Sequence, residues 1–295
     1  MPEPITRRSL ILSAAAAAPL LLTARSSGAT DAKEDVSDEL AALEAKTGGR
    51  LGVSVFDTQT NVAFGRRERE RFGLGSTFKA LAAACVLARV DEGRERLDRR
   101  IAYGEGALVP QSPVTARYAG REGMTLGEIC RAAVTHSDNT AGNIMLDVIG
   151  GPAAFTAWLR DTGDTETRLD RAEPELNRVT PGDPRDTTTP EAMLATLGRL
   201  ALGEVLSDAS RMRLVDWMVE NETGGRRLRA GLPPAWRVGD RTGTGPSLAA
   251  DIAVAWPGRR DPILIAVYMA ETTAPDEQLD AVFAAVGTLV AGMVG

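Results

Sequence analysis

The chain has 295 residues, of which 25% are charged and 43% hydrophobic, with a formal net charge of −6 at pH 7. This is the composition of an ordinary globular protein that can form one sizeable core or two small domains. The acidic balance argues against a nucleic-acid partner. Two cysteines and one histidine are too few for the usual zinc sites, and we expect no metal and no other cofactor.

The first segment, residues 1–29, predicts an exported protein. Arg7 and Arg8 precede an apolar stretch and then small residues, which is the layout of a twin-arginine signal peptide. We place its cleavage near Ala29. A membrane anchor is the alternative, but the apolar part is short and Pro19 interrupts it. We therefore expect a periplasmic or extracellular monomer without a membrane partner.

The next elements follow from apolar spacing. A helix is predicted over residues 35–45, where Val36, Leu40 and Leu43 recur at helical spacing, and a hairpin of two strands over residues 51–65. From residue 76 to about residue 221 the pattern is mostly helical. The helices are expected at residues 76–88, 124–134, 139–151, 151–163, 189–203 and 207–221.

A polar loop with three prolines, residues 167–188, interrupts the helical region and is too long for a simple connector, so we expect it to be functional. The chain ends in three strands and a helix, at residues 236–245, 250–258, 263–272 and 275–294. Strands at both chain ends predict one sheet with a helical insertion and a cleft between them. The expected units are residues 30–70 with 222–295, and residues 71–221 with the loop 168–186.

Ser76 and Lys79 form the first chemical motif. They are three residues apart at the start of a helix that is otherwise apolar all round, so they share one face. A serine hydroxyl is a weak nucleophile until a base takes its proton. A lysine in an apolar setting can have its pKa lowered enough to be that base or to relay the proton. The motif alone is weak, because a serine that caps a helix beside a chance lysine looks the same.

Three further motifs follow in order: His136–Asn139 (HSDN), Glu173–Asn177 (EPELN) and Asp240–Gly245 (DRTGTG). Taken singly, they fit a helix cap, a solvated acidic turn and a strand end. Separate structural explanations of this kind do not account for all four motifs in this order and at these separations. In this combination the chain resembles the class A β-lactamases, the serine penicillinases, over about residues 35–293.

The resemblance implies an α/β fold of the α+β type. An antiparallel five-stranded sheet is flanked by terminal helices and joined to a mostly helical domain, as in β-lactamases and penicillin-binding transpeptidases. It also implies hydrolysis of the β-lactam amide bond of penicillin-type antibiotics, which gives resistance. The expected partner is the small-molecule β-lactam itself.

Roles in acylation are carried over by resemblance. Ser76 attacks the lactam carbonyl, and the backbone N–H groups of Ser76 and Thr244 form the oxyanion hole. Ser137 passes a proton to the departing lactam nitrogen. Either Lys79 or Glu173 serves as the base for acylation.

The resemblance also assigns deacylation and binding. Glu173, the general base, and Asn177 hold the water that hydrolyses the acyl-enzyme. The implied substrate contacts are Asn139, Arg241, Thr242, Gly243, Thr244, Arg227 and Gln111. Asn143 would pin the loop, an ion pair of Arg171 with Asp186 would close it, and the bond from Glu173 to Pro174 would be cis.

The chain departs from the family pattern in several places. Arg241 stands where lysine is usual, which keeps the charge and resembles the carbenicillin-hydrolysing subgroup. Arg227 matches a second arginine near the carboxylate pocket, although it could be one surface arginine among three. Gln111 replaces an aromatic residue at the cleft entrance. Cys85 and Cys130 do not match a family disulfide, and we expect none.

Two other functions share this chemistry. A penicillin-binding D,D-peptidase would use the same serine and lysine, and a penicillin sensor would acylate and stop. Neither needs a carboxylate that deacylates a penicilloyl-enzyme, so Glu173 and Asn177 argue against both.

Overall fold

The computed structural model describes residues 27–294. Most of the predicted signal peptide, including Arg7 and Arg8, lies outside the described residues. Within them, no helix combines the length and the apolar character that a membrane span requires.

The centre of the molecule is a five-stranded sheet in which every neighbouring pair is antiparallel. Its strands are β1 (Arg50–Asp57), β2 (Val62–Arg66), β7 (Arg237–Gly245), β8 (Leu248–Trp256) and β9 (Ile263–Ala270). The spatial order is β2-β1-β9-β8-β7, so strands from both chain ends pair in one sheet. This confirms the predicted fold class.

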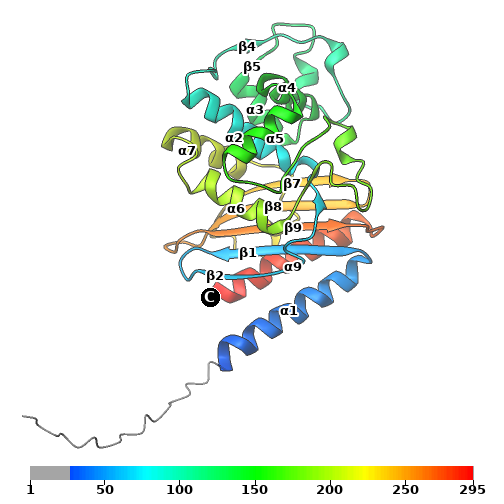
Figure 1. Cartoon of the computed structure of the whole chain (residues 1–295), viewed down its shortest axis with the longest axis vertical. Coiled ribbons are helices and arrows are strands. Elements are labelled where there is room, and N and C mark those ends of the chain that lie inside the picture. Colours follow the sequence, from blue (N-terminus) through cyan, green and yellow to red (C-terminus); the bar gives the residue numbers. More distant parts are fainter. Residues whose placement is uncertain (1–26, 295) are drawn as a thin grey trace, which may run out of the picture.

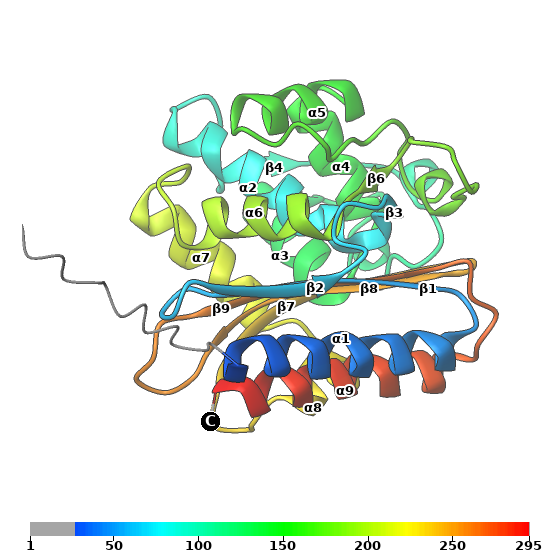
Figure 2. The same cartoon turned by 60° about the horizontal axis from the view of Figure 1, so that its bottom comes forward.

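Helices cover both faces of the sheet, as Figure 2 shows. The terminal helices lie on one face: α1 (Ser27–Thr47), α8 (Leu228–Gly231) and α9 (Asp276–Val294). The other face carries α2 (Phe78–Asp91), α3 (Leu126–His136), α4 (Asn139–Ile149), α5 (Pro152–Asp161), α6 (Pro190–Ala201) and α7 (Asp208–Val219). In Figure 1 this second group forms the upper half of the molecule.

Because both faces are covered, the sheet separates two hydrophobic cores. Side chains of a strand alternate between its faces, and β9 shows the alternation directly. Ile265 and Val267 belong to the core under α1 and α9, whereas Ala266 and Tyr268 belong to the core under the helical half. All eight residues of β9 are buried.

Short elements complete the chain, and the sequence patterns did not predict them. Four two-residue strands pair as β3 (Phe72–Gly73) with β6 (Thr187–Thr188) and β4 (Arg100–Ile101) with β5 (Met124–Thr125). Short 3₁₀ helices occupy Gly75–Thr77, Glu105–Ala107, Thr115–Arg117 and Glu175–Asn177.

Helix starts follow the local sequence. Thr189 caps α6 with Pro190 in the first turn, as expected from the sequence, and Asp138 caps α4 by accepting from the backbone N–H of Ala141. Several starts differ from the prediction. Helix α1 begins at Ser27 rather than at residue 35, and α3 begins at Leu126 rather than at residue 124. Helix α2 begins at Phe78, and Ser76 lies in the preceding 3₁₀ turn rather than in the helix itself.

Candidate active site

The 3₁₀ turn before α2 brings Ser76 and Lys79 together. The Lys79 Nζ donates to Ser76 Oγ at 3.0 Å, and the Lys79 side chain is fully buried. Burial lowers the pKa of Lys79 to about 8. The carboxylate of Glu173 opposes this shift, and the charge of Arg241 adds to it. The predicted pair therefore forms, although Ser76 lies in the turn before α2 rather than on the helix itself, and its partner is an amine with a lowered pKa.

The loop before α6 supplies a carboxylate. Glu173 is buried, its Oε1 lies 3.1 Å from Lys79 Nζ, and Ser76 Oγ donates to the same oxygen at 3.3 Å. The Asn177 side chain donates to Glu173 Oε2 at 2.6 Å. Ser76 Oγ is thus within hydrogen-bond reach of both an amine and a carboxylate.

Contacts at both ends hold this loop. Asn143 on α4 donates to the Glu173 carbonyl at 3.0 Å and accepts from its N–H at 2.9 Å. The Arg171 Nε donates to Asp186 Oδ2 at 2.5 Å. The bond from Glu173 to Pro174 is cis, as the resemblance implies.

The junction between α3 and α4 supplies the next two side chains. Ser137 ends α3 in the left-handed conformation, at φ 59°, and its carbonyl accepts from Lys79 Nζ at 2.9 Å. Its Oγ lies 3.5 Å from that nitrogen. The Asn139 Oδ1 accepts from Lys79 at 2.5 Å, and its Nδ2 donates to the Pro110 carbonyl. The tight turn therefore points both residues at the amine.

Strand β7 closes the opposite side. It runs so near Ser76 that a Cβ atom at Gly243 would lie 3.1 Å from the Ser76 nitrogen, and one at Gly75 would lie 3.4 Å from the Thr244 nitrogen. The backbone N–H groups of Ser76 and Thr244 thus lie near each other. Two such N–H groups can stabilise a developing oxyanion.

Arg241 on β7 lies beneath the cleft rather than in its wall. It is fully buried and donates to Ser137 Oγ at 2.6 Å. Burial lowers the pKa of Arg241 to about 10. Its neighbour Thr242 lines the cleft and shares a hydrogen bond with Thr223.

Arg227 is not a surface arginine. It is buried and donates to the carbonyls of Gly243 and Ala250 and to Thr244 Oγ1, each at 2.8 Å. Asp280 on α9 accepts from Arg227 Nε at 2.9 Å. The sequence analysis did not predict Asp280 as a site residue, because no motif lies near it in the chain.

These groups surround one cavity of about 560 Å³. It is lined by Ser76, Pro110, Gln111, Ser137, Asn139, Pro174, Asn177, Arg178, Thr223, Arg226, Arg227, Thr242, Thr244, Gly245, Pro246, Asp276 and Asp280. Among the described residues, no cluster of histidine, cysteine and carboxylate side chains could hold a metal ion. Cys85 and Cys130 are buried free thiols, and burial raises the pKa of both.

Comparison with known proteins agrees with this geometry. The profile described as the beta-lactamase enzyme family matches residues 35–293. Beta-lactamase L2 of Stenotrophomonas maltophilia is 45% identical over 98% of this chain and 99% of its own length. The carbapenem-hydrolyzing beta-lactamase KPC of Klebsiella oxytoca is also 45% identical, over 86% of this chain and 87% of its own length.

A solved structure of an ancestral (GNCA) class A beta-lactamase is 59% identical and superposes with a TM-score of 0.86. The superposition covers 88% of this chain and 99% of that one. The chain belongs to the beta-lactamase family, as a serine enzyme of class A. Its activity is hydrolysis of β-lactams, and such hydrolysis confers resistance to these antibiotics.

Proposed function

We propose that the enzyme opens penicillin-type β-lactams through an acyl-enzyme on Ser76. Ser76 Oγ bonds to the lactam carbonyl carbon, the C–N bond breaks, and the serine proton reaches the lactam nitrogen. The single observation that carries this proposal is the contact of Ser76 Oγ with both Lys79 Nζ and Glu173 Oε1. The neighbouring N–H groups of Ser76 and Thr244 would stabilise the oxyanion.

The proton route runs through the buried amine. A lysine with a pKa of about 8 has a neutral fraction at pH 7 that can accept the serine proton. Ser137 then delivers a proton to the lactam nitrogen, since its Oγ lies 3.5 Å from Lys79 and accepts from Arg241. Glu173 is the second base within reach of Ser76, and it remains a candidate for the acylation step.

Deacylation uses the loop. Glu173 takes a proton from a water that attacks the acyl carbonyl carbon, the ester bond to Ser76 breaks, and the proton returns to Ser76 Oγ. Asn177, which donates to Glu173 at 2.6 Å, orients that carboxylate and the water. Asn143, Pro174 and the pair of Arg171 with Asp186 support the loop.

The remaining cleft residues bind the substrate. Asn139 and Gln111 would contact the acyl side chain. Arg227 and Arg241 supply positive charge behind Thr242 and Thr244 on β7, where a substrate carboxylate would lie. Gly243 keeps this strand close to Ser76.

The testing experiment counts benzylpenicillin molecules hydrolysed per enzyme by purified residues 30–295. We expect many turnovers by the wild type and none by Ser76→Ala. Glu173→Ala should accumulate a covalent adduct that mass spectrometry detects. Wild-type turnover by Glu173→Ala would overturn the deacylation role. One equivalent consumed by the wild type, with a stable adduct, would assign the chain to the penicillin-binding peptidases or sensors.

Export and organisation complete the proposal. Arg7, Arg8 and the following apolar stretch support a twin-arginine signal cleaved near Ala29, with a periplasmic or extracellular monomer as product. Replacing both arginines by lysine should retain the precursor in the cytoplasm, as cell fractionation would measure. The proposed units are residues 30–70 with 222–295, and residues 71–221 with the catalytic loop 168–186.

A further inference from the structure

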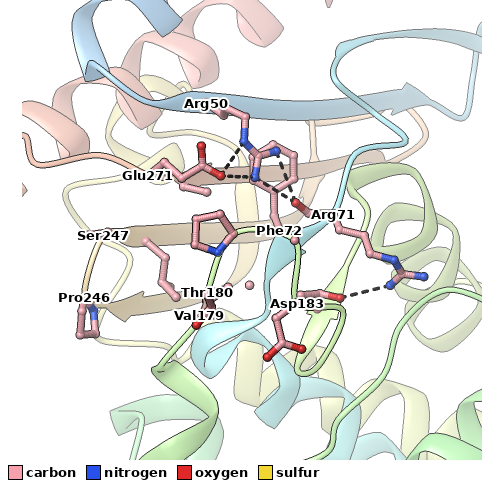
Figure 3. A pocket seen from close by; sticks show the side chains of 15 residues that line it. Arg50, Arg71, Phe72, Val179, Thr180, Asp183, Pro246, Ser247 and Glu271 are labelled. Atoms are coloured by element: carbon pink, nitrogen blue, oxygen red, sulfur yellow. Dashed lines mark hydrogen bonds and ion pairs between the residues drawn. The ribbon is translucent and has the colours of Figure 1, made fainter.

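A second cavity lies behind the loop that carries Glu173. Its volume is about 310 Å³, at the lower end of the range for small-molecule sites. Figure 3 shows it between the ends of the sheet strands, the loop segment 179–183 and the turn at Pro246 and Ser247. Pro246 alone is shared with the lining of the catalytic cleft. The cavity is therefore a separate site.

The inner wall of this cavity is apolar. Phe72 and Leu248 are buried, and Val179 faces them from the loop. Val179 packs so closely over β3 that a Cβ atom at Gly73 would lie 2.6 Å from its Cγ2. The wall would gain from burial against an apolar ligand face.

One side of the cavity is a stacked pair. The Arg50 guanidinium lies over the Phe72 ring, 4.7 Å from its centroid (Figure 3). Its in-plane donors are already used, by Glu271 at 2.9 and 3.1 Å, by Glu70 at 3.0 Å and twice by the Arg71 carbonyl at 3.4 Å. A guanidinium bonded in this way offers a ligand its planar face rather than its N–H groups.

The other charges around the cavity are also paired. Arg71 donates to Glu166 Oε2 at 2.6 Å and to Thr187 Oγ1 at 3.1 Å. Asp183 accepts from Arg185 at 2.7 Å. A charged ligand would lose its water and find no unpaired opposite charge in return. The lining therefore favours an uncharged molecule.

We propose that this cavity binds an uncharged, planar, electron-rich aromatic molecule of the indole type. Its ring extends the stack of Arg50 and Phe72 through cation–π attraction and lies against Val179 and Leu248. The hydroxyl groups of Thr180 and Ser247 at the rim serve its polar edge.

The bound molecule also acts on catalysis, because it touches both elements that position the catalytic groups. Asn177 lies two residues before Val179 in the loop. It also packs against β7, because a Cβ atom at Gly245 would lie 3.1 Å from the Asn177 Cβ. Leu248 extends from the cavity to the residue before Ser76. A Cβ atom at Gly75 would lie 3.1 Å from the Leu248 Cδ1. Occupancy therefore changes kcat for β-lactams without competing for the cleft.

The first arm of the test is calorimetric titration of the full mature chain with three matched probes. Indole-3-ethanol is neutral, indole-3-acetate is an anion and tryptamine is a cation. We expect one equivalent of indole-3-ethanol to bind with a Kd below about 1 mM, and both charged probes to bind at least about fivefold more weakly. This arm is independent of catalytic turnover, so it is unaffected if the proposed function fails.

Variants then locate the probe. Thr180→Trp fills the cavity from an exposed position, and Arg50→Gln removes the stacked guanidinium. Both should weaken binding by about tenfold or more. Arg121→Trp, at an exposed position of the helical half, is the matched control and should bind like the wild type.

The second arm measures benzylpenicillin hydrolysis with and without indole-3-ethanol. We expect kcat to change by about twofold or more, KM to stay constant, and Thr180→Trp to show no response. Absence of binding, equal binding of all three probes, or unchanged binding by Thr180→Trp would overturn the site. Competition with benzylpenicillin would place the probe in the catalytic cleft, and an unchanged kcat would refute the coupling.

Discussion

Lys79 is a basic side chain in the place least favourable to its charge. It is fully buried among three oxygen acceptors, Ser76 Oγ, the Ser137 carbonyl and Asn139 Oδ1, and it lies beside the Glu173 carboxylate. Three protons on an ammonium group cannot serve all four neighbours at once. These acceptors favour the charged amine, but burial outweighs them and lowers the pKa of Lys79 to about 8, so the amine can give up a proton and accept one from Ser76.

The lowered pKa of Lys79 makes a stability prediction with a definite sign. Below about pH 8 the amine is charged in both states, and the folded state bears the cost of burying it. Between about pH 8 and the ordinary lysine value of about 10.4 the unfolded chain binds more protons, so stability rises with pH. We expect the free energy of unfolding of the wild type, measured in urea at several pH values, to rise relative to that of Lys79→Met across this window. A difference that stays flat would contradict the lowered pKa.

At the residue scale, sequence reasoning reached the groups that are close in the chain. The pair of Ser76 and Lys79 was predictable because a spacing of three residues places side chains on one helix face. The contact between Arg227 and Asp280 was not, because 53 residues separate the two and only the packing of α9 joins them. Local spacing carries no information about such a pair.

The loop 168–186 is the element that carries Glu173 and Asn177. Arg171 ties its two ends together through Asp186, and it also donates to the Arg178 carbonyl in the middle of the loop at 3.2 Å. Replacing Arg171 by alanine should let Glu173 and Asn177 drift from Ser76, and small displacements of catalytic groups cost about 10- to 100-fold in rate.

For Arg171→Ala we therefore expect a slower kcat with acyl-enzyme accumulating, measured by stopped-flow kinetics and mass spectrometry. Arg185→Ala is the matched control in the same loop, because its exposed pair with Asp183 contributes little. If both variants kept wild-type kcat, the loop would not depend on its closing ion pair.

The packing of α8 on α9 is a second element that allows a sharp comparison. A Cβ atom at Gly231 would lie 1.8 Å from the Ala284 carbonyl oxygen, whereas one at Gly225 would meet nothing within 4 Å. Gly231→Ala should lower the free energy of unfolding by about 1–3 kcal/mol or more, because the helices must separate. Gly225→Ala should stay within about 0.5 kcal/mol of the wild type. Equal urea midpoints for the two variants would contradict the close packing.

At the element scale, long periodic segments were predictable and short ones were not. Helices such as α6 and α7 show three turns of apolar spacing with a capping residue. The two-residue strands β3 and β6 show no periodicity, since pairing of Phe72 with Thr188 depends on the loop folding back onto the sheet. The cavity beside them was equally beyond the reach of sequence patterns.

At the scale of the whole molecule, the site depends on both chain ends. Ser76, Lys79 and Glu173 come from the helical half, whereas β7 and α9 bring Thr244 and Asp280 from the C-terminal part. The sheet couples the positions of the two halves, because strands β8 and β9 take part in both cores. We call the helices α1, α8 and α9 the far layer, because the sheet separates them from the helical half. Substrate binding should therefore depend on specific contacts made by the far layer, and not only on how stably that layer is folded.

Two variants in that far layer separate these effects. Asp280→Asn removes the charge that holds Arg227, so the Arg227 side chain should turn away from Thr244. We expect this change to raise KM for benzylpenicillin by about 5- to 50-fold, which corresponds to about 1–2 kcal/mol. Leu40→Ala, in the fully buried face of α1, should lower the free energy of unfolding by about 2–5 kcal/mol and leave KM unchanged. Both are measured at 15 °C, where the folded fraction of each variant can be checked by circular dichroism. If Leu40→Ala raised KM as much as Asp280→Asn, loss of far-layer stability alone would explain the effect, and Asp280 would have no positioning role.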